Sequence, residues 1–114
     1  MTSRIDQLRA LSESDPTDET IAYLLGMELA SEQRFEEACQ AFEEALRRRP
    51  DYSAAYRQLG NGLEKLGQFQ RAADVYQKGS HIAEAAGDLQ AGKEMRAFLR
   101  RLARDRGIEP GAEG

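Results

Sequence analysis

Apolar residues along this chain recur at spacings of three and four, the period of an α-helix that buries one face. In the first segment, Ile5, Leu8 and Leu11 fall on one side of a short amphipathic helix over residues 3–12. The same pattern, interrupted by prolines and glycines, predicts further helices at about 15–32, 35–48, 52–66, 69–86 and 88–106. β-branched residues are scarce, and Val75 is the only valine. We therefore predict an all-α fold of about six helices.

Local signals suggest where these helices begin and end. Asp15 followed by Pro16 is typical of a helix start, with the acid as N-cap and the proline in the first turn. Asp51, directly after Pro50, is expected to cap the next helix in the same way. Gly67 is expected to end that helix, because glycine is the usual residue after a helix C-terminus.

The central part of the chain comes into register with itself when it is shifted so that Leu25 falls on Leu59. The same shift places Gly26 on Gly60, Leu29 on Leu63, Phe35 on Phe69, and Ala38 on Ala72. The matched positions are small or apolar, so the two segments are expected to pack alike. Gly26 and Gly60 are interpreted as the points where two helices of a unit cross closely, with the alanines as their small partners. No packing role follows for Gly62.

These residues resemble the tetratricopeptide repeat, whose signature is W-x2-L-G-x2-Y, then A-x3-F, then P, with a period of about 34 residues. The first unit has Ala22, Leu25, Gly26, Leu29, Ala38, Phe42 and Pro50 at the signature positions. The second has Tyr56, Leu59, Gly60, Leu63, Ala72 and Tyr76, and Glu84 replaces the proline, so its last helix is expected to run on. The resemblance implies antiparallel helix pairs stacked in a right-handed superhelix.

The domain organisation that follows has five parts. We expect an N-terminal helix (1–14), a first repeat unit (15–51), a second repeat unit (52–86), a capping helix (87–106) and a flexible tail (107–114). Lys93-Glu94 stands where a third unit would have Leu-Gly, so a third full repeat is not expected.

Composition and charge limit the kinds of partner and the location that we expect. The net charge of −4 gives no general attraction to nucleic acid, so we do not expect nucleic acid as a partner. Residues 93–106 are basic and have two readings: a surface for acidic ligands, or a capping helix with its arginines in water, which we favour. No apolar run is long enough for a membrane span, and the chain opens on no signal-type run, so a cytoplasmic location is expected.

No catalytic or metal-binding set is visible. Cys39 is the only cysteine and His81 the only histidine, and a zinc site usually needs three or four ligands at close spacing. We interpret Cys39 as a buried apolar residue and His81 as a surface or packing residue. We predict no enzyme activity, no cofactor and no metal.

The resemblance instead implies a protein-binding surface, because the first helix of each tetratricopeptide unit lines a concave groove that usually takes a peptide. Following one helix stripe in steps of one repeat predicts the peptide-binding residues Tyr23 and Met27, then Arg57, Asn61 and Lys65, then Met95. The polar members would hold a carboxylate or peptide carbonyls, and the others apolar side chains. Arg57 and Asn61 resemble part of the carboxylate clamp of chaperone-binding members, but apolar residues fill the clamp's other places. A solvated stripe, or one paired with Glu64 or Asp88, is the simpler alternative.

The rival function is self-assembly. Repeat arrays expose an apolar end unless it is capped. The N-terminal helix, with Ile5, Leu8 and Leu11, either caps its own chain or packs on a second copy, and the capping helix offers a second such surface. A homodimer or larger homo-oligomer is therefore the alternative to a peptide-binding module.

Overall fold

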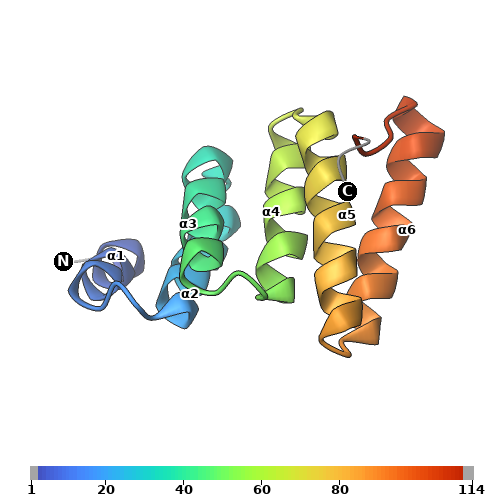
Figure 1. Cartoon of the computed structure of the whole chain (residues 1–114). Helices are drawn as coiled ribbons and strands as arrows, with labels where there is room; N and C mark the ends of the chain where they lie inside the picture. The colour runs from blue at the N-terminus through green and yellow to red at the C-terminus, as the bar shows by residue number, and fades with distance from the viewer. Residues whose placement is uncertain (1–2, 112–114) are drawn as a thin grey trace.

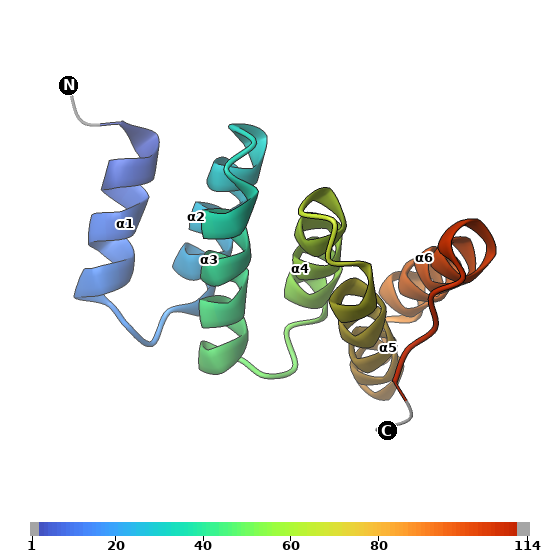
Figure 2. The same cartoon turned by 90° about the horizontal axis from the view of Figure 1, so that it is seen from above.

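A computed structural model describes residues 3–111, which form six α-helices and no strand. The helices are α1 (Arg4–Ser14), α2 (Glu19–Ser31), α3 (Phe35–Arg48), α4 (Ser53–Lys65), α5 (Phe69–Ala85) and α6 (Leu89–Arg106). They follow one another along an elongated array, 46 × 28 × 23 Å in extent, with α1 at one end and α6 at the other (Figures 1 and 2). The predicted all-α class is confirmed.

Two predicted capping residues are wrong. Residues 15–18 form a turn, and α2 begins after Asp18, whose carboxylate accepts a hydrogen bond from the Ile21 backbone N–H at 3.1 Å. Asp15 instead accepts hydrogen bonds from Thr17, its neighbour in this turn. The N-cap of α4 is Tyr52 and makes no side-chain capping bond, so Asp51 does not cap it. Both acids lie within a turn of the true start, which is the usual uncertainty in reading a boundary from sequence.

The expected close crossings occur at both repeat glycines. A Cβ added to Gly26 would lie 2.5 Å from the Phe42 ring, and one added to Gly60 would overlap the Tyr76 ring. The rings, and not the alanines we expected, are therefore the nearest neighbours of the glycines. Ala38 and Ala72 are nevertheless fully buried in the same core.

Gly62 has a packing role that the sequence did not reveal. A Cβ at this position would lie 2.7 Å from the Cys39 Sγ, so the glycine lets α4 approach α3. Gly62 and Cys39 are both buried. The contact crosses between the two units, and a comparison of one unit with the other cannot detect it.

Contacts between helices that are separated by one other helix in the chain show how the array curves. Among the described helices, the backbone of α2 approaches that of α4, and α4 approaches α6, whereas the backbones of α1, α3 and α5 stay apart from one another. The helices α2, α4 and α6 are therefore closer together than the others, and the array is concave on their side.

Arg48 ties α1 and the following turn to α3. Its side chain is only 8% exposed, and its guanidinium donates to the backbone carbonyls of Ser12 (3.2 Å) and Asp18 (2.9 Å). Its Nε donates to the Glu44 carboxylate at 2.9 Å. The Ser12 carbonyl belongs to the last turn of α1, where carbonyls lack helical partners. One arginine thus satisfies these groups and holds α1 in place.

The C-terminal segment lies against α5. Gly107 ends α6 with φ 65°, Ile108 is partly buried, and Gln70 donates a hydrogen bond to the Glu109 carbonyl at 2.6 Å. The Gly111 N–H donates to Asp74 at 2.7 Å. Residues 107–111 therefore differ from the flexible tail that we expected. Residues 112–114 of that tail, and residues 1–2 of the N-terminal segment, lie outside the described part.

Candidate peptide-binding surface

Two helices of the concave side, α2 and α4, carry stripes of exposed or half-buried residues at matching positions. The helical period places Thr20, Leu24, Met27 and Ser31 on one side of α2, and the equivalent positions of the second unit, Ala54, Gln58, Asn61 and Lys65, on the same side of α4. We call these eight residues the α2–α4 surface. Its α2 half is the more apolar, because Leu24 is 40% exposed and Met27 is 38% exposed.

Leu24 was missed by the sequence analysis. The stripe had been followed through Tyr23 and Met27, in steps of four, whereas the exposed side of α2 also includes positions three residues apart. Leu24 lies three residues before Met27, and 40% of its surface is exposed. The sequence did contain a signal for Leu24, because this apolar residue stands at a position of the repeat outside the buried face of the helix.

Tyr23 lies at the edge of this surface and is half-buried. Its ring centroid is 5.7 Å from that of Phe42 and 5.0 Å from that of Tyr52. The side chain therefore helps to pack α2 against α3 and the start of α4, and only part of it is available to a ligand.

Arg57 is already paired within the chain. Its Nη1 donates to the Glu94 carboxylate of α6 at 2.7 Å, and both side chains are partly exposed. The hydrogen bond from Arg57 is the main reason why the pKa of Glu94 is lowered. We had weighed Glu64 and Asp88 as partners; the acid that pairs with Arg57 is a third one, Glu94. Any ligand carboxylate at Arg57 would have to compete with it.

Asn61 belongs to a network around the buried Tyr76 hydroxyl. That hydroxyl lies 2.6 Å from the Asn61 Oδ1 and 2.5 Å from the Glu64 carboxylate, which Arg101 of α6 also binds through two bonds of 2.8 Å. Burial disfavours the charged form of Glu64, but the bonds from Arg101 and Tyr76 outweigh it and lower the pKa of Glu64. Burial and the nearby carboxylate raise the pKa of Tyr76. The network fixes the orientation of Asn61 at the surface.

Lys65 is the most accessible of the predicted polar residues. It lies in the last turn of α4 and is exposed. Its positive charge lies near the negative end of the α4 dipole, which stabilises the helix. Its ammonium group extends the α2–α4 surface toward solvent.

The assignment of Met95 to the surface is wrong. Its side chain is 0% exposed and packs between helices, where a Cβ on Gly79 would lie 2.6 Å from its sulfur. The cause is the length of α5, which has 17 residues where α3 has 14. Both ion pairs between α4 and α6, Arg57–Glu94 and Glu64–Arg101, accordingly join positions 37 apart. A step of one repeat from Asn61 therefore reached the buried Met95, whereas the residues of α6 that actually meet Arg57 and Glu64 lie 37 positions on, at Glu94 and Arg101.

The arginines of α6 are largely engaged within the chain. Arg96 pairs with Glu84, Arg101 with Glu64, and Arg104 with Asp105. Arg106 lies over the Phe69 ring, 3.8 Å from its centroid. Met95 and Leu102 are buried, as expected of a helix that covers the second unit.

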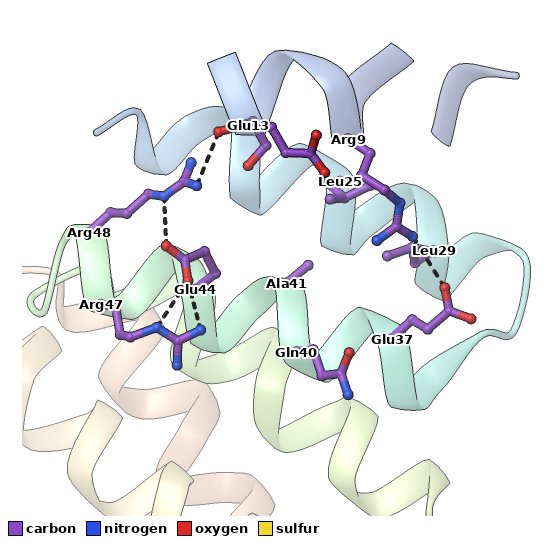
Figure 3. Close-up of a pocket in the computed structure, with 11 residues that line it drawn as sticks. Arg9, Glu13, Leu25, Leu29, Glu37, Gln40, Ala41, Glu44, Arg47 and Arg48 are labelled. Carbon is purple, nitrogen blue, oxygen red and sulfur yellow. Dashed lines mark hydrogen bonds and ion pairs between the residues drawn. The ribbon is translucent and has the colours of Figure 1, made fainter. Parts of the chain in front are cut away.

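A separate pocket of about 350 Å³ lies between α1 and α3 (Figure 3). Leu25, Leu29 and Ala41 line it with apolar atoms, and charged residues surround them. Arg9 donates to Glu37 at 3.2 Å and Arg47 to Glu44 at 2.7 Å, so the chain's own ion pairs occupy much of the rim (Figure 3). The pocket exists because the backbones of α1 and α3 do not approach each other closely.

Three further features bear on the chemistry of residues 3–111. Within residues 3–111, no group of three or more His, Cys, Asp or Glu side chains is placed to hold a metal ion. Cys39 is buried, and this burial raises the pKa of its thiol to about 11. None of the described helices has both the length and the apolar content needed to cross a membrane.

Comparison with known proteins identifies the family. A family model described as "Tetratricopeptide repeat" matches residues 20–52. The TPR repeat-containing protein PA0015 of Pseudomonas aeruginosa is 35% identical over 71 residues, which make up 62% of this chain and 68% of that protein. The chain belongs to the tetratricopeptide repeat family.

Solved structures agree with this assignment. Protein BPP2914 from Bordetella parapertussis is 31% identical and superposes with a TM-score of 0.78 over 92% of this chain and 91% of that one. A tetratricopeptide repeat domain protein from Salinibacter ruber is 28% identical, with a TM-score of 0.71 over 78% and 90% of the two chains. A structure of MamA is 26% identical with a TM-score of 0.69; the match covers 72% of this chain but only 47% of MamA. The repeat fold implies a module for protein–protein interaction.

Proposed function

We propose that this chain is a non-catalytic module that binds a segment of another protein on the α2–α4 surface. The observation that carries the proposal is the exposure of Leu24 and Met27 on the concave side of α2. Only four large apolar residues of the described part are this exposed, and two of them lie here, three residues apart. Apolar groups gathered on a concave surface mark binding sites more often than scattered ones do.

The surface suggests a division of roles. Leu24 and Met27, with the edge of Tyr23, would contact apolar side chains of the bound segment, and methionine adapts readily to different partners. Lys65 and the Asn61 amide would hold a carboxylate or backbone carbonyls. Arg57 would join them only after releasing Glu94. Met95 has no part in this proposal, because it is buried.

Selection of peptides from a displayed random library, followed by calorimetric titration of the best binders, tests this proposal. The double variant Leu24→Ser/Met27→Ser should weaken binding at least tenfold, because it removes most of the exposed apolar area of the surface. The matched control is Lys78→Glu, a change at an exposed position of α5 outside the surface. A library that yields no binder, or binders that the double variant holds as tightly as wild type, would reject the α2–α4 surface.

The role of Arg57 needs its own test. If Arg57 anchors a ligand carboxylate, Arg57→Ala should weaken the selected peptide by less than the roughly 1.5–3 kcal/mol of a charge-assisted bond, because the bond to Glu94 has to break first. Glu94→Gln should strengthen it, because the competing carboxylate is removed. Unchanged affinity in both variants would leave the apolar half as the binding determinant and remove Arg57 from the site. The cytoplasmic location expected from the sequence stays a prediction.

A further inference from the structure

The two ends of the array have complementary helix types. In both units the second helix, α3 or α5, places an aromatic ring against a glycine of the first helix, α2 or α4. The first helices also contact one another, and α6 contacts α4 as a helix of this first type. α1 lies before α2, as α3 lies before α4, and is therefore of the second type. Within residues 3–111, the array starts at a helix of the second type, α1, and finishes at a helix of the first type, α6 (Figure 2).

The outer side of α1 carries an exposed leucine beside a shallow hollow. Leu11 occupies the position in α1 that corresponds to Ala45 in α3, and Ala45 is fully buried beside Ala22 of the preceding helix. Leu11 has no preceding helix within the described part and is 51% exposed. A shallow hollow with mostly apolar walls runs along this side, lined by Asp6, Gln7, Ala10, Leu11 and Ser14.

The outer side of α6 carries the most exposed large apolar residue. Leu89 is 60% exposed and begins a stripe at spacings of three and four that continues through Lys93, Arg96, Arg100 and Arg104. The stripe lies away from Ala91, Met95 and Leu102, which α6 buries against the array. This is the side on which a second helix would complete the pair.

We propose that α6 of one copy packs against α1 of a second copy, so that the junction completes one more helix pair. The helices of a pair run antiparallel, which brings the end of α1 that carries Leu11 to the end of α6 that carries Leu89. Because the two contacting surfaces differ, each added copy leaves one free surface at each end, and assembly is open and head to tail.

Charge favours this arrangement over a symmetric one. Residues 3–18 carry four acids (Asp6, Glu13, Asp15, Asp18) and two bases (Arg4, Arg9), a net charge of −2. Residues 88–106 carry six bases (Lys93, Arg96, Arg100, Arg101, Arg104, Arg106) and three acids (Asp88, Glu94, Asp105), a net charge of +3. Two further acids, Glu64 and Glu84, pair with Arg101 and Arg96 and reduce the net charge at this end to +1. Unlike ends attract and like ends repel, so α1 to α6 contacts are favoured over α1 to α1 or α6 to α6 contacts, most strongly at low salt.

Mass in solution, measured by sedimentation equilibrium on the full chain over rising concentration, tests the proposal. Wild type should rise from the monomer mass of 12.7 kDa past the dimer, and added salt should lower the average mass. Leu11→Lys and Leu89→Glu each place a charge that the facing end of the next copy repels, so each disables one end and should be monomeric alone. Mixed in equal amounts, they retain one matching pair of ends and should form a one-to-one complex and nothing larger.

The control is Leu24→Glu, which alters an exposed leucine on the α2–α4 surface and should assemble like wild type. Thermal unfolding by circular dichroism checks that all variants are folded. A wild-type chain that stays monomeric up to about 1 mM would overturn the proposal. So would a dimer that survives in either end variant, a mixture that stays monomeric, or loss of assembly in Leu24→Glu. Peptide binding on the α2–α4 surface should persist in both end variants, so the two proposals fail independently.

Discussion

Replacement of Arg48 by alanine should cost far more stability than replacement of its neighbour Arg47, although both bind the same carboxylate. Arg47 is 67% exposed and donates to Glu44 at 2.7 Å. Arg48 is 8% exposed, donates to Glu44, and also donates to the carbonyls of Ser12 and Asp18. Comparing the two variants therefore distinguishes the contribution of an exposed ion pair, made by Arg47, from that of a buried set of bonds, made by its neighbour Arg48.

The magnitude follows from the bonds that Arg48 makes. Two of them, to Glu44 and to the Asp18 carbonyl, are 2.9 Å long. A bond with a charged donor contributes roughly 1.5–3 kcal/mol. Taking the lower value, because Arg47 still neutralises Glu44 in the variant, gives about 3 kcal/mol for Arg48→Ala. Arg47→Ala should cost about 0.5 kcal/mol, as for an exposed pair within one helix.

Urea unfolding followed by far-ultraviolet circular dichroism measures both free energies. Hydrogen exchange adds a local measurement: the amides of α1 should lose protection in Arg48→Ala more than those of α5, because the lost bonds join α1 and its turn to α3. Arg48→Lys should be intermediate, since an ammonium group cannot reproduce the guanidinium fork. Equal losses for Arg47→Ala and Arg48→Ala would refute the reasoning, as would unchanged exchange in α1.

Three further predictions concern single positions. Gly62→Ala should destabilise the protein by about 1 kcal/mol, although alanine is the better helix former, because its Cβ would meet the Cys39 sulfur. Adding Cys39→Ala to this variant should recover most of the lost stability, and additive effects of the two substitutions in urea unfolding would exclude the contact between positions 39 and 62. Glu64→Gln should reduce the loss of stability at acid pH. The folded-state pKa of Glu64 lies below 4.5, so the carboxylate stabilises the fold above that pH and stops doing so as the pH falls through the folded-state pKa. If the free energy of unfolding in urea falls with decreasing pH as steeply in the variant as in wild type, this prediction is contradicted. The Cys39 thiol, with a pKa near 11 against an ordinary 9.0, should react with iodoacetamide at least about a hundredfold more slowly than an exposed cysteine at pH 8, and fast labelling of the folded protein would show that it is accessible.

The sequence predicted the helices and their pairing because the repeat reports contacts made in the same way by both units. Gly26 and Gly60 show this: each meets an aromatic ring of the following helix, Phe42 or Tyr76, at the same spacing, and this shared spacing made the crossing visible. Gly62 could not be explained in this way. Its neighbour Cys39 belongs to the preceding unit, and the first unit has Glu28 at the corresponding position, which pairs with Arg4 of α1 instead.

The candidate surface was predicted less well, because exposure depends on neighbours that the repeat does not encode. The greater length of α5 changes the register between α4 and α6 and buries Met95. The pairing of Arg57 with Glu94 requires the same altered register. On α2 and α4, which follow the repeat period, Met27 and Lys65 are exposed, whereas Tyr23, Arg57 and Asn61 are partly buried.

The two halves of the concave side therefore differ in what they offer a ligand. α4 and α6 are joined by polar contacts that satisfy one another, between Ser53 and Asp88 at 2.9 Å, Arg57 and Glu94, and Glu64 and Arg101. A ligand carboxylate entering there gains a bond only by breaking one, so its net contribution is small. On α2, in contrast, Leu24 and Met27 keep 40% and 38% of their surface exposed, and covering that part with a ligand breaks no existing bond. Affinity on this surface should accordingly depend more on apolar side chains of the bound segment than on its charge, and should change little with salt, in contrast to the head-to-tail contact between the oppositely charged ends.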